Sequence, residues 1–93
     1  MGVVRLFATL RKLANDQRSV EVSWTAGEPI GSVIDELVRL NPALDGQIVG
    51  EDGAILPYVG IFLNGKNVRH LEGLQTPVNS DTEVAIFPPV AGG

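Results

Sequence analysis

The longest helical pattern in the chain covers residues 30–40 and restricts the folds that the chain can form. Apolar side chains recur there at i, i+3, i+4 and i+7, which places them on one face of a helix. These side chains are Ile30, Val33, Ile34, Leu37, Val38 and Leu40. Asp35, Glu36 and Arg39 fall between them and form a polar face. Such a helix must bury its apolar face against another element, so that partner decides the fold class.

The start of this helix has two alternatives. Pro29 suits its first turn, whereas Ser32 with Asp35 three residues later could form a capping box. Asn41-Pro42 is expected to end the helix, because a residue before proline disfavours helical geometry. A second, shorter helix is expected over residues 9–15, where apolar residues are spaced three apart.

Four further segments carry the patterns of β-strands. They are residues 3–8, 20–24, 58–63 and 83–87. The third is followed by Asn64-Gly65, the strongest two-residue signal for a hairpin, so residues 66–68 are expected to return as its partner strand. The fourth is followed by Pro88-Pro89, which ends it because proline cannot donate a hydrogen bond to a strand ladder.

The order of these elements predicts an α+β fold. The first two strands are close enough for a hairpin, and the last strand can lie parallel beside the first, with the main helix packed across one face. This is the ubiquitin-like β-grasp arrangement, with a mixed sheet of four or five strands. We expect residues 1–87 to form this domain and residues 88–93 to form an extended, flexible C-terminal tail.

Composition excludes several classes of protein. The formal net charge is −4, from 11 acidic and 7 basic side chains, which argues against a nucleic-acid binder. The chain has no cysteine and therefore no disulfide, thiolate nucleophile or cysteine-bound metal. No apolar run approaches the roughly 20 residues of a membrane span, and nothing near the start resembles a signal peptide. We expect a cytoplasmic protein that contacts neither membrane nor nucleic acid.

The chain carries no recognisable catalytic constellation. Its one histidine, His70, has no cysteine or second histidine to join it, and we expect it to be solvated. No glycine spacing matches a phosphate-binding loop. We therefore expect neither an enzyme nor a metal site, and no bound cofactor.

The end of the chain is the remaining candidate site. Two prolines favour an extended exit from the domain, and Gly92-Gly93 has no side chains to obstruct a narrow channel. Such a tail can present its terminal carboxylate to a partner enzyme. The alternative is a frayed terminus that ends in glycine by chance. That alternative leaves the apolar residues 87–91 unexplained.

Three stretches of the sequence resemble the MoaD/ThiS family of β-grasp sulfur carriers. They are residues 4–14, residues 62–65 with Val68, and residues 83–93. The last stretch is the most specific and is similar to the ending of molybdopterin synthase small subunits. The sequence departs from the family at residues 79–83, where Asp-Gly-Asp-Glu is usual, and the extra length of residues 42–57 is more like carriers of the CysO type.

The resemblance implies a function for each residue of the tail. The Gly93 carboxylate would be adenylated and then converted to a thiocarboxylate, while Gly92 would permit threading into the partner. The root of the tail would dock on partners through Phe87, Pro88, Pro89, Val90 and Ala91. Phe7 lies at a family position that tends to face partners, although a place in the core is an equal alternative.

The resemblance also implies two kinds of partner. An activating enzyme related to ubiquitin-activating enzymes would use ATP, and an acceptor enzyme would take the sulfur. The first acceptor to consider is the molybdopterin synthase large subunit, which would make this chain the small subunit in molybdenum cofactor biosynthesis. The alternatives are a CysO-type carrier for a cysteine synthase, a ubiquitin-like modifier conjugated through Gly93, and an interaction module with an inert tail.

Overall fold

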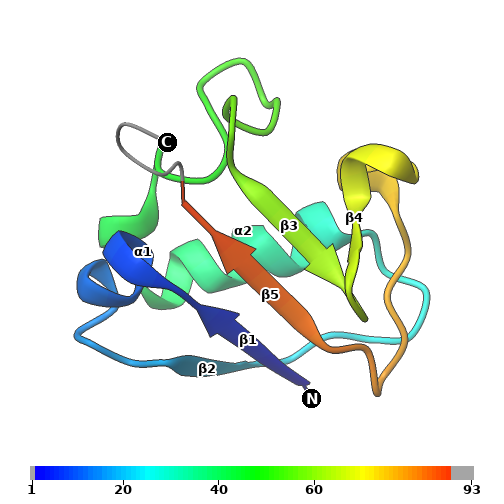
Figure 1. The fold of residues 1–93 in the computed structure, drawn as a ribbon. Helices are drawn as coiled ribbons and strands as arrows, with labels where there is room; N and C mark the ends of the chain where they lie inside the picture. The colour runs from blue at the N-terminus through cyan, green and yellow to red at the C-terminus, as the bar shows by residue number, and fades with distance from the viewer. Residues whose placement is uncertain (1, 89–93) are drawn as a thin grey trace.

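A mixed sheet of five strands in the order β2-β1-β5-β3-β4 forms the frame of the protein (Figure 1). The structure is a computed structural model and describes residues 2–88. The strands are β1 (Gly2–Leu6), β2 (Ser19–Val22), β3 (Gly60–Leu63), β4 (Lys66–Asn67) and β5 (Val84–Phe87). The helices are α1 (Ala8–Leu13), α2 (Ile30–Leu40) and the 3-10 turns η1 (Pro42–Leu44), η2 (Val68–His70) and η3 (Gly73–Gln75).

The strand pairing is the one that the sequence predicts. β1 and β2 form an antiparallel hairpin, while β5 lies parallel beside β1 and antiparallel to β3. Val4 of β1 is opposite Val84 of β5, and both side chains are fully buried. The expected α+β, ubiquitin-like β-grasp fold is therefore confirmed.

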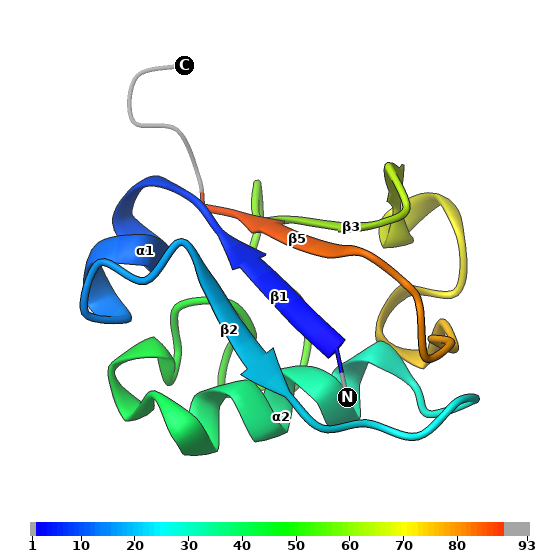
Figure 2. The same cartoon turned by 90° about the horizontal axis from the view of Figure 1, so that it is seen from below.

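Helix α2 covers one face of the sheet and supplies much of the core (Figure 2). Its buried residues are Ile30, Val33, Ile34 and Leu37. The predicted bounds of residues 30–40 are confirmed. Of the two predicted starts, the structure has Pro29 just before the first turn, and the Ile30 N–H donates to the Thr76 carbonyl over 2.8 Å. Ser32 lies inside the helix, so the capping-box alternative is wrong.

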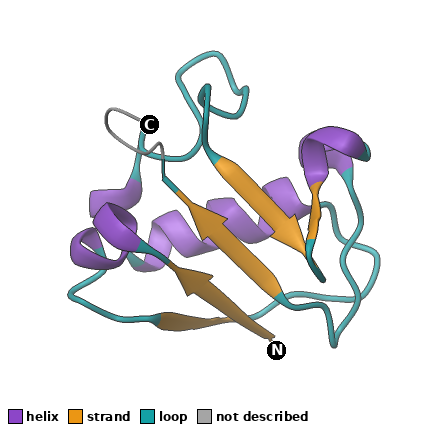
Figure 3. Cartoon of the chain, in the orientation of Figure 1, coloured by secondary structure: helices purple, strands orange, loops and turns teal. Residues whose placement is uncertain are grey.

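The segments expected to be irregular contain short elements of their own (Figure 3). Residues 42–57 begin with η1 and include an isolated bridge between Val49 and Ile55. Residues 69–81 contain most of η2 and all of η3. Three-residue turns of this kind have too few positions to show a period, which is why the sequence pattern does not reveal them.

The predicted Asn64-Gly65 turn is confirmed. Asn64 has φ +50° and Gly65 has φ +84°, and two positive values are what a type I′ hairpin turn requires. The Asn64 side chain also accepts a hydrogen bond from the Glu83 N–H over 2.8 Å. The turn is thereby tied to the residue that precedes β5.

Trp24 packs directly over Gly2, and this contact gives a first prediction. A Cβ atom at Gly2 would lie 2.0 Å from Cη2 of Trp24, whose Nε1 donates to the Asn79 carbonyl over 2.8 Å. Gly2→Ala should therefore push the ring outward and destabilise the fold by about 1–3 kcal/mol. Thermal unfolding and the emission of the single tryptophan check this. Val3→Ala is the neighbouring control, and unchanged emission in Gly2→Ala would contradict the prediction.

Candidate functional site

All three phenylalanines of the chain lie on the outer face of the sheet, away from α2. Along β1, β3 and β5 the side chains alternate between the two faces, and Leu6, Ile61 and Ile86 point into the core. The neighbours of these core residues point the other way. We call the resulting cluster of Phe7, Phe62 and Phe87 the aromatic face. The core cluster is made of aliphatic side chains and Trp24, and these three rings lie outside it.

The aromatic face is held together by ring contacts. Phe7 stacks on Phe87 with 4.2 Å between ring centroids and 12° between the planes. Phe62 meets Phe87 edge-on at 5.4 Å and 87°. The Arg5 guanidinium lies 5.7 Å from the centroid of Phe7, within the range of a cation–π contact. Phe87 remains 39% exposed at the centre of the cluster, so this surface is both ordered by its own contacts and open to a partner.

A groove of about 670 Å³ runs from the aromatic face toward η2. It is lined by Tyr58, Val59, Gly60, Phe62, Asn67, Arg69, Phe87 and Pro88. Gly60 lies opposite Phe87 in the sheet, and its missing side chain keeps the groove open beside that ring. A Cβ atom there would lie 2.8 Å from Cε1 of Phe62. The groove therefore has a glycine on its floor, an aromatic wall and a cationic end.

The structure brings together some of the residues that the sequence analysis singled out. Phe7 is half-buried and Phe87 exposed, and the two rings touch; Phe7 is not part of the core. Pro88, the first residue of the expected tail, is buried and lines the groove. The remaining tail residues lie outside the described part of the chain: Pro89, Val90, Ala91, Gly92 and Gly93.

Sequence reasoning missed Phe62, Tyr58 and Arg69 as site residues. The strand pattern over residues 58–63 is apolar throughout and does not distinguish its two faces. The hairpin turn shows which residues of the strand face outward. The turn at Asn64-Gly65 fixes the register of the hairpin, and every second residue of the strand then lies on the outer face. Phe62 then falls beside Phe87, as observed.

Other charged groups do not assemble into a site within residues 2–88. No group of three or more histidine, cysteine, aspartate or glutamate side chains there could hold a metal ion. His70 is exposed in η2, as expected. Arg39 donates to Glu36 on α2, and this hydrogen bond raises the pKa of Arg39; the pair is on the opposite side of the sheet from the aromatic face. Neither helix in the described range is long and apolar enough to span a bilayer.

The fold and this exposed sheet face define a ubiquitin-like β-grasp protein. The profile of the ThiS family matches residues 4–93, almost the entire chain. The chain belongs to the ThiS family of ubiquitin-like β-grasp proteins, as the sequence resemblance indicated.

Named relatives cover nearly the full length of the chain. Small archaeal modifier protein 3 of Haloferax volcanii is 36% identical over 90 residues, which are 97% of this chain and 96% of that protein. Sulfur carrier protein CysO of Mycobacterium tuberculosis is 31% identical over 86 residues, 90% of this chain and 89% of that protein. A chain in the crystal structure of the Amycolatopsis orientalis BexX/CysO complex superposes with a TM-score of 0.86 at 25% identity, covering 100% of both chains. The relatives thus include sulfur carriers and small modifiers.

Proposed function

We propose that this protein is a sulfur carrier that works through the carboxylate of Gly93. In the first step a carboxylate oxygen attacks the α-phosphorus of ATP, pyrophosphate leaves, and an acyl-adenylate forms. A sulfide-level donor then attacks the carbonyl carbon and AMP leaves, so that the chain ends in a thiocarboxylate. The chain has no cysteine, so a persulfide on its own side chains is not available and the terminus is the place for the sulfur.

The observation that carries the proposal is the position of the aromatic face at the root of the tail. Phe87 and Pro88 are the last described residues, and both line the groove. The five residues beyond them, 89–93, span at most roughly 17 Å when fully extended. An enzyme that receives the Gly93 carboxylate in its active site must therefore cover the end of the sheet where the aromatic face lies.

The protein acts in this scheme as a carrier and co-substrate, and its partners perform the chemistry. Residues 88–93 form the tail, in which Gly92 permits threading and the residues from Phe87 to Ala91 dock the root. An E1-like activating enzyme binds the ATP, and the carrier itself needs no cofactor. The contribution of the carrier is to position its carboxylate. We place this cycle in the cytoplasm.

The acceptor of the sulfur is the second partner. The ending of the sequence favours the molybdopterin synthase large subunit, and the likeness to CysO keeps a cysteine synthase as the alternative. Both acceptors use the same thiocarboxylate. Purified thiocarboxylate protein offered separately to each enzyme with its own substrate distinguishes them, since only the true acceptor converts the terminus back to a carboxylate.

A second candidate function is covalent modification of other proteins. It is favoured by the 36% identity to a small archaeal modifier protein. The adenylation step would be shared, and a lysine amine would then replace AMP to give an isopeptide bond. Mass spectrometry of tryptic peptides from cells would find lysines joined to the carrier's C-terminal residues in this case.

Intact mass spectrometry tests the main proposal. The full chain is incubated with ATP, an activating enzyme from the same genome and a sulfide source. We expect a mass gain that corresponds to one oxygen replaced by sulfur, and fragmentation should place it at Gly93. If the mass stays unchanged with every such activating enzyme, the protein is not a sulfur carrier.

A further inference from the structure

Tyr58 has an unusual backbone and an unusual exposure at the same time. Its φ is +68°, in the left-handed region that bulky side chains rarely adopt, and its side chain is 87% exposed. The next residue, Val59, is buried in the core. The chain therefore has a strained backbone two residues before β3, at the same residue whose aromatic ring is exposed to solvent. Strain of this kind persists only where surrounding contacts impose it.

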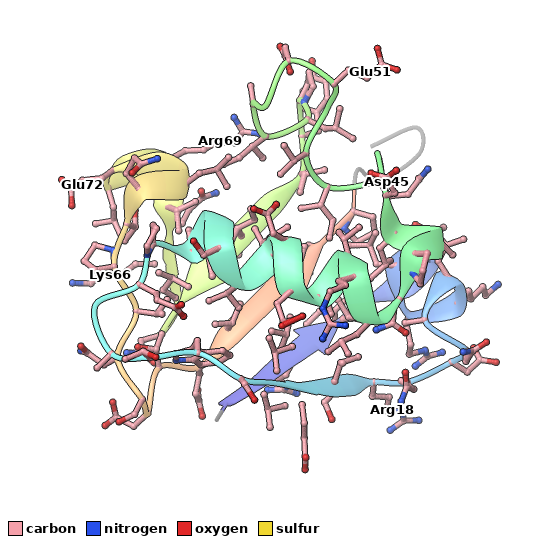
Figure 4. All side chains as sticks on the ribbon, turned by 180° about the vertical axis from the view of Figure 1, so that it is seen from behind. Arg18, Asp45, Glu51, Lys66, Arg69 and Glu72 are labelled. Carbon is pink, nitrogen blue, oxygen red and sulfur yellow. The ribbon has the colours of Figure 1, made fainter. Side chains whose placement is uncertain are left out.

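Arg69 supplies part of those contacts from a distant part of the chain. Its Nη2 donates to the Leu56 carbonyl over 2.6 Å and to the Val59 carbonyl over 3.2 Å. These carbonyls lie on the two sides of Tyr58. The backbone closes the turn of residues 56–59, because the Val59 N–H donates to the Leu56 carbonyl over 3.1 Å, and the guanidinium braces this turn from outside. The backbone of Arg69 is held at the start of η2, because its N–H donates to the Asn67 side chain over 2.9 Å. Figure 4 shows Arg69 reaching from η2 toward this loop.

This loop lies at the end of the sheet where the tail leaves. Tyr58 and Arg69 line the same groove as Phe87 and Pro88. The reach of about 17 Å from Pro88 to the terminus brings the activating enzyme over this groove. Because the tail begins beside the groove and is short, an enzyme that binds the Gly93 carboxylate also covers the groove. Tyr58 stands at the rim, where a partner must pass it.

We propose that Tyr58 contacts the activating enzyme and that Arg69 is the positioning residue that holds it there. The inference rests on the proposed function, since it names a further contact for the same partner. A tyrosine combines an apolar ring with a hydroxyl and loses little entropy on binding, because it has few rotatable bonds. The matching surface of the enzyme would offer an apolar side chain to the ring and a hydrogen-bonding group to the hydroxyl.

The first arm of the test follows Tyr58 in the free protein. The chain has a single tyrosine, so ¹³C and ¹⁵N labelling of tyrosine gives one set of backbone signals. Arg69→Met keeps an unbranched stem and removes the donors. We expect the Tyr58 backbone signals, which report its positive φ, to move toward free-peptide values and the amides of residues 58–60 to exchange faster in this variant. Arg18→Met removes the same charge at the opposite end of the molecule and should leave the signals in place (Figure 4).

The second arm measures activation by ATP–pyrophosphate exchange at varied carrier concentration. Tyr58→Gly removes the ring, and the new glycine accepts the positive φ of this position without steric cost. We expect roughly tenfold higher KM for the carrier in Tyr58→Gly and in Arg69→Met, with kcat unchanged, as for loss of one interface contact. In the double variant the KM should equal that of Tyr58→Gly alone, because Arg69 acts through Tyr58.

The outcomes separate the two proposals. If the wild-type chain is never activated, the proposed function fails, and the activating enzyme is then not the partner of Tyr58. If the wild type is activated while Tyr58→Gly keeps the wild-type KM, the Tyr58 contact is overturned and the proposed function stands. Two results would show that Arg69 does not position Tyr58. One is a rise in KM in the double variant equal to the product of the two single rises, and the other is unchanged tyrosine signals in Arg69→Met.

Discussion

Removing Gly93 is expected to abolish activation while leaving the fold unchanged. The shortened chain still ends in a carboxylate, but that carboxylate lies one residue, about 3.3–3.6 Å along an extended chain, short of its place in the partner. Misplacement by about 1 Å can cost a factor of 100 in rate, so we expect a loss of more than about 1,000-fold. Pyrophosphate exchange and intact mass measure the loss. The core lies within residues 4–86, so the melting temperature should not change.

The matched control for this truncation is Gly92→Ala. It keeps the length of the tail and the position of the carboxylate, and it adds one methyl group to the segment that threads the partner. An intermediate loss is expected, smaller than that of the Gly93 deletion. If the truncated chain is adenylated at the wild-type rate, Gly93 is not the residue that the partner activates.

Local patterns account for the individual helices, strands and turns that were predicted from the sequence. Helix α2 depends on a spacing of apolar residues within eleven positions, and the hairpin at Asn64-Gly65 depends on two residues. The parallel pairing of β5 with β1 joins distant segments. It was predicted because the short hairpin and the single long helix leave few other places for the last strand.

The start of β3 could not be predicted from such local patterns. Residues 58 and 59 carry the same apolar character as the strand that follows, and the sequence extends the strand over them. The structure begins β3 at Gly60 because residues 56–59 form a turn. The Val59 N–H closes this turn by donating to the Leu56 carbonyl over 3.1 Å, and Arg69 braces it by binding the carbonyls of Leu56 and Val59. The Arg69 contacts join residues ten or more positions apart in the sequence, so a local pattern does not reveal them.

The candidate site also has residues that could be predicted from the sequence and an arrangement that could not. Phe87 and Phe7 were both predicted from the family resemblance, which left open whether Phe7 faces a partner or the core. Only the register of β1, β5 and β3 brings these rings together with Phe62. The groove depends in addition on Gly60, because a side chain at this position would collide with Phe62.

Replacing Phe87 with serine is expected to raise the KM of the activating enzyme for the carrier by roughly 30-fold or more, the effect of losing an interface hot spot. Phe87 touches both other rings of the aromatic face and still exposes 39% of its surface. Its loss would remove the centre of the surface on which we propose that the activating enzyme docks. The kcat should be little changed, because Gly93 and the length of the tail are intact. Pyrophosphate exchange at varied carrier concentration separates the two constants.

Val3→Ser is the matched control for this substitution. Val3 lies on the same outer face and is 43% exposed, but it lies at the other end of β1, beside Ser80 and Asp81. Phe87→Ser also loses ring contacts within the carrier, which should cost about 1–2 kcal/mol of stability. Both variants must therefore be assayed well below their melting temperatures. An equal rise in KM for the two would mean that the partner binds the whole sheet face without a preference for the aromatic end. A rise for Phe87→Ser alone places the docking site at the root of the tail, within reach of Gly93.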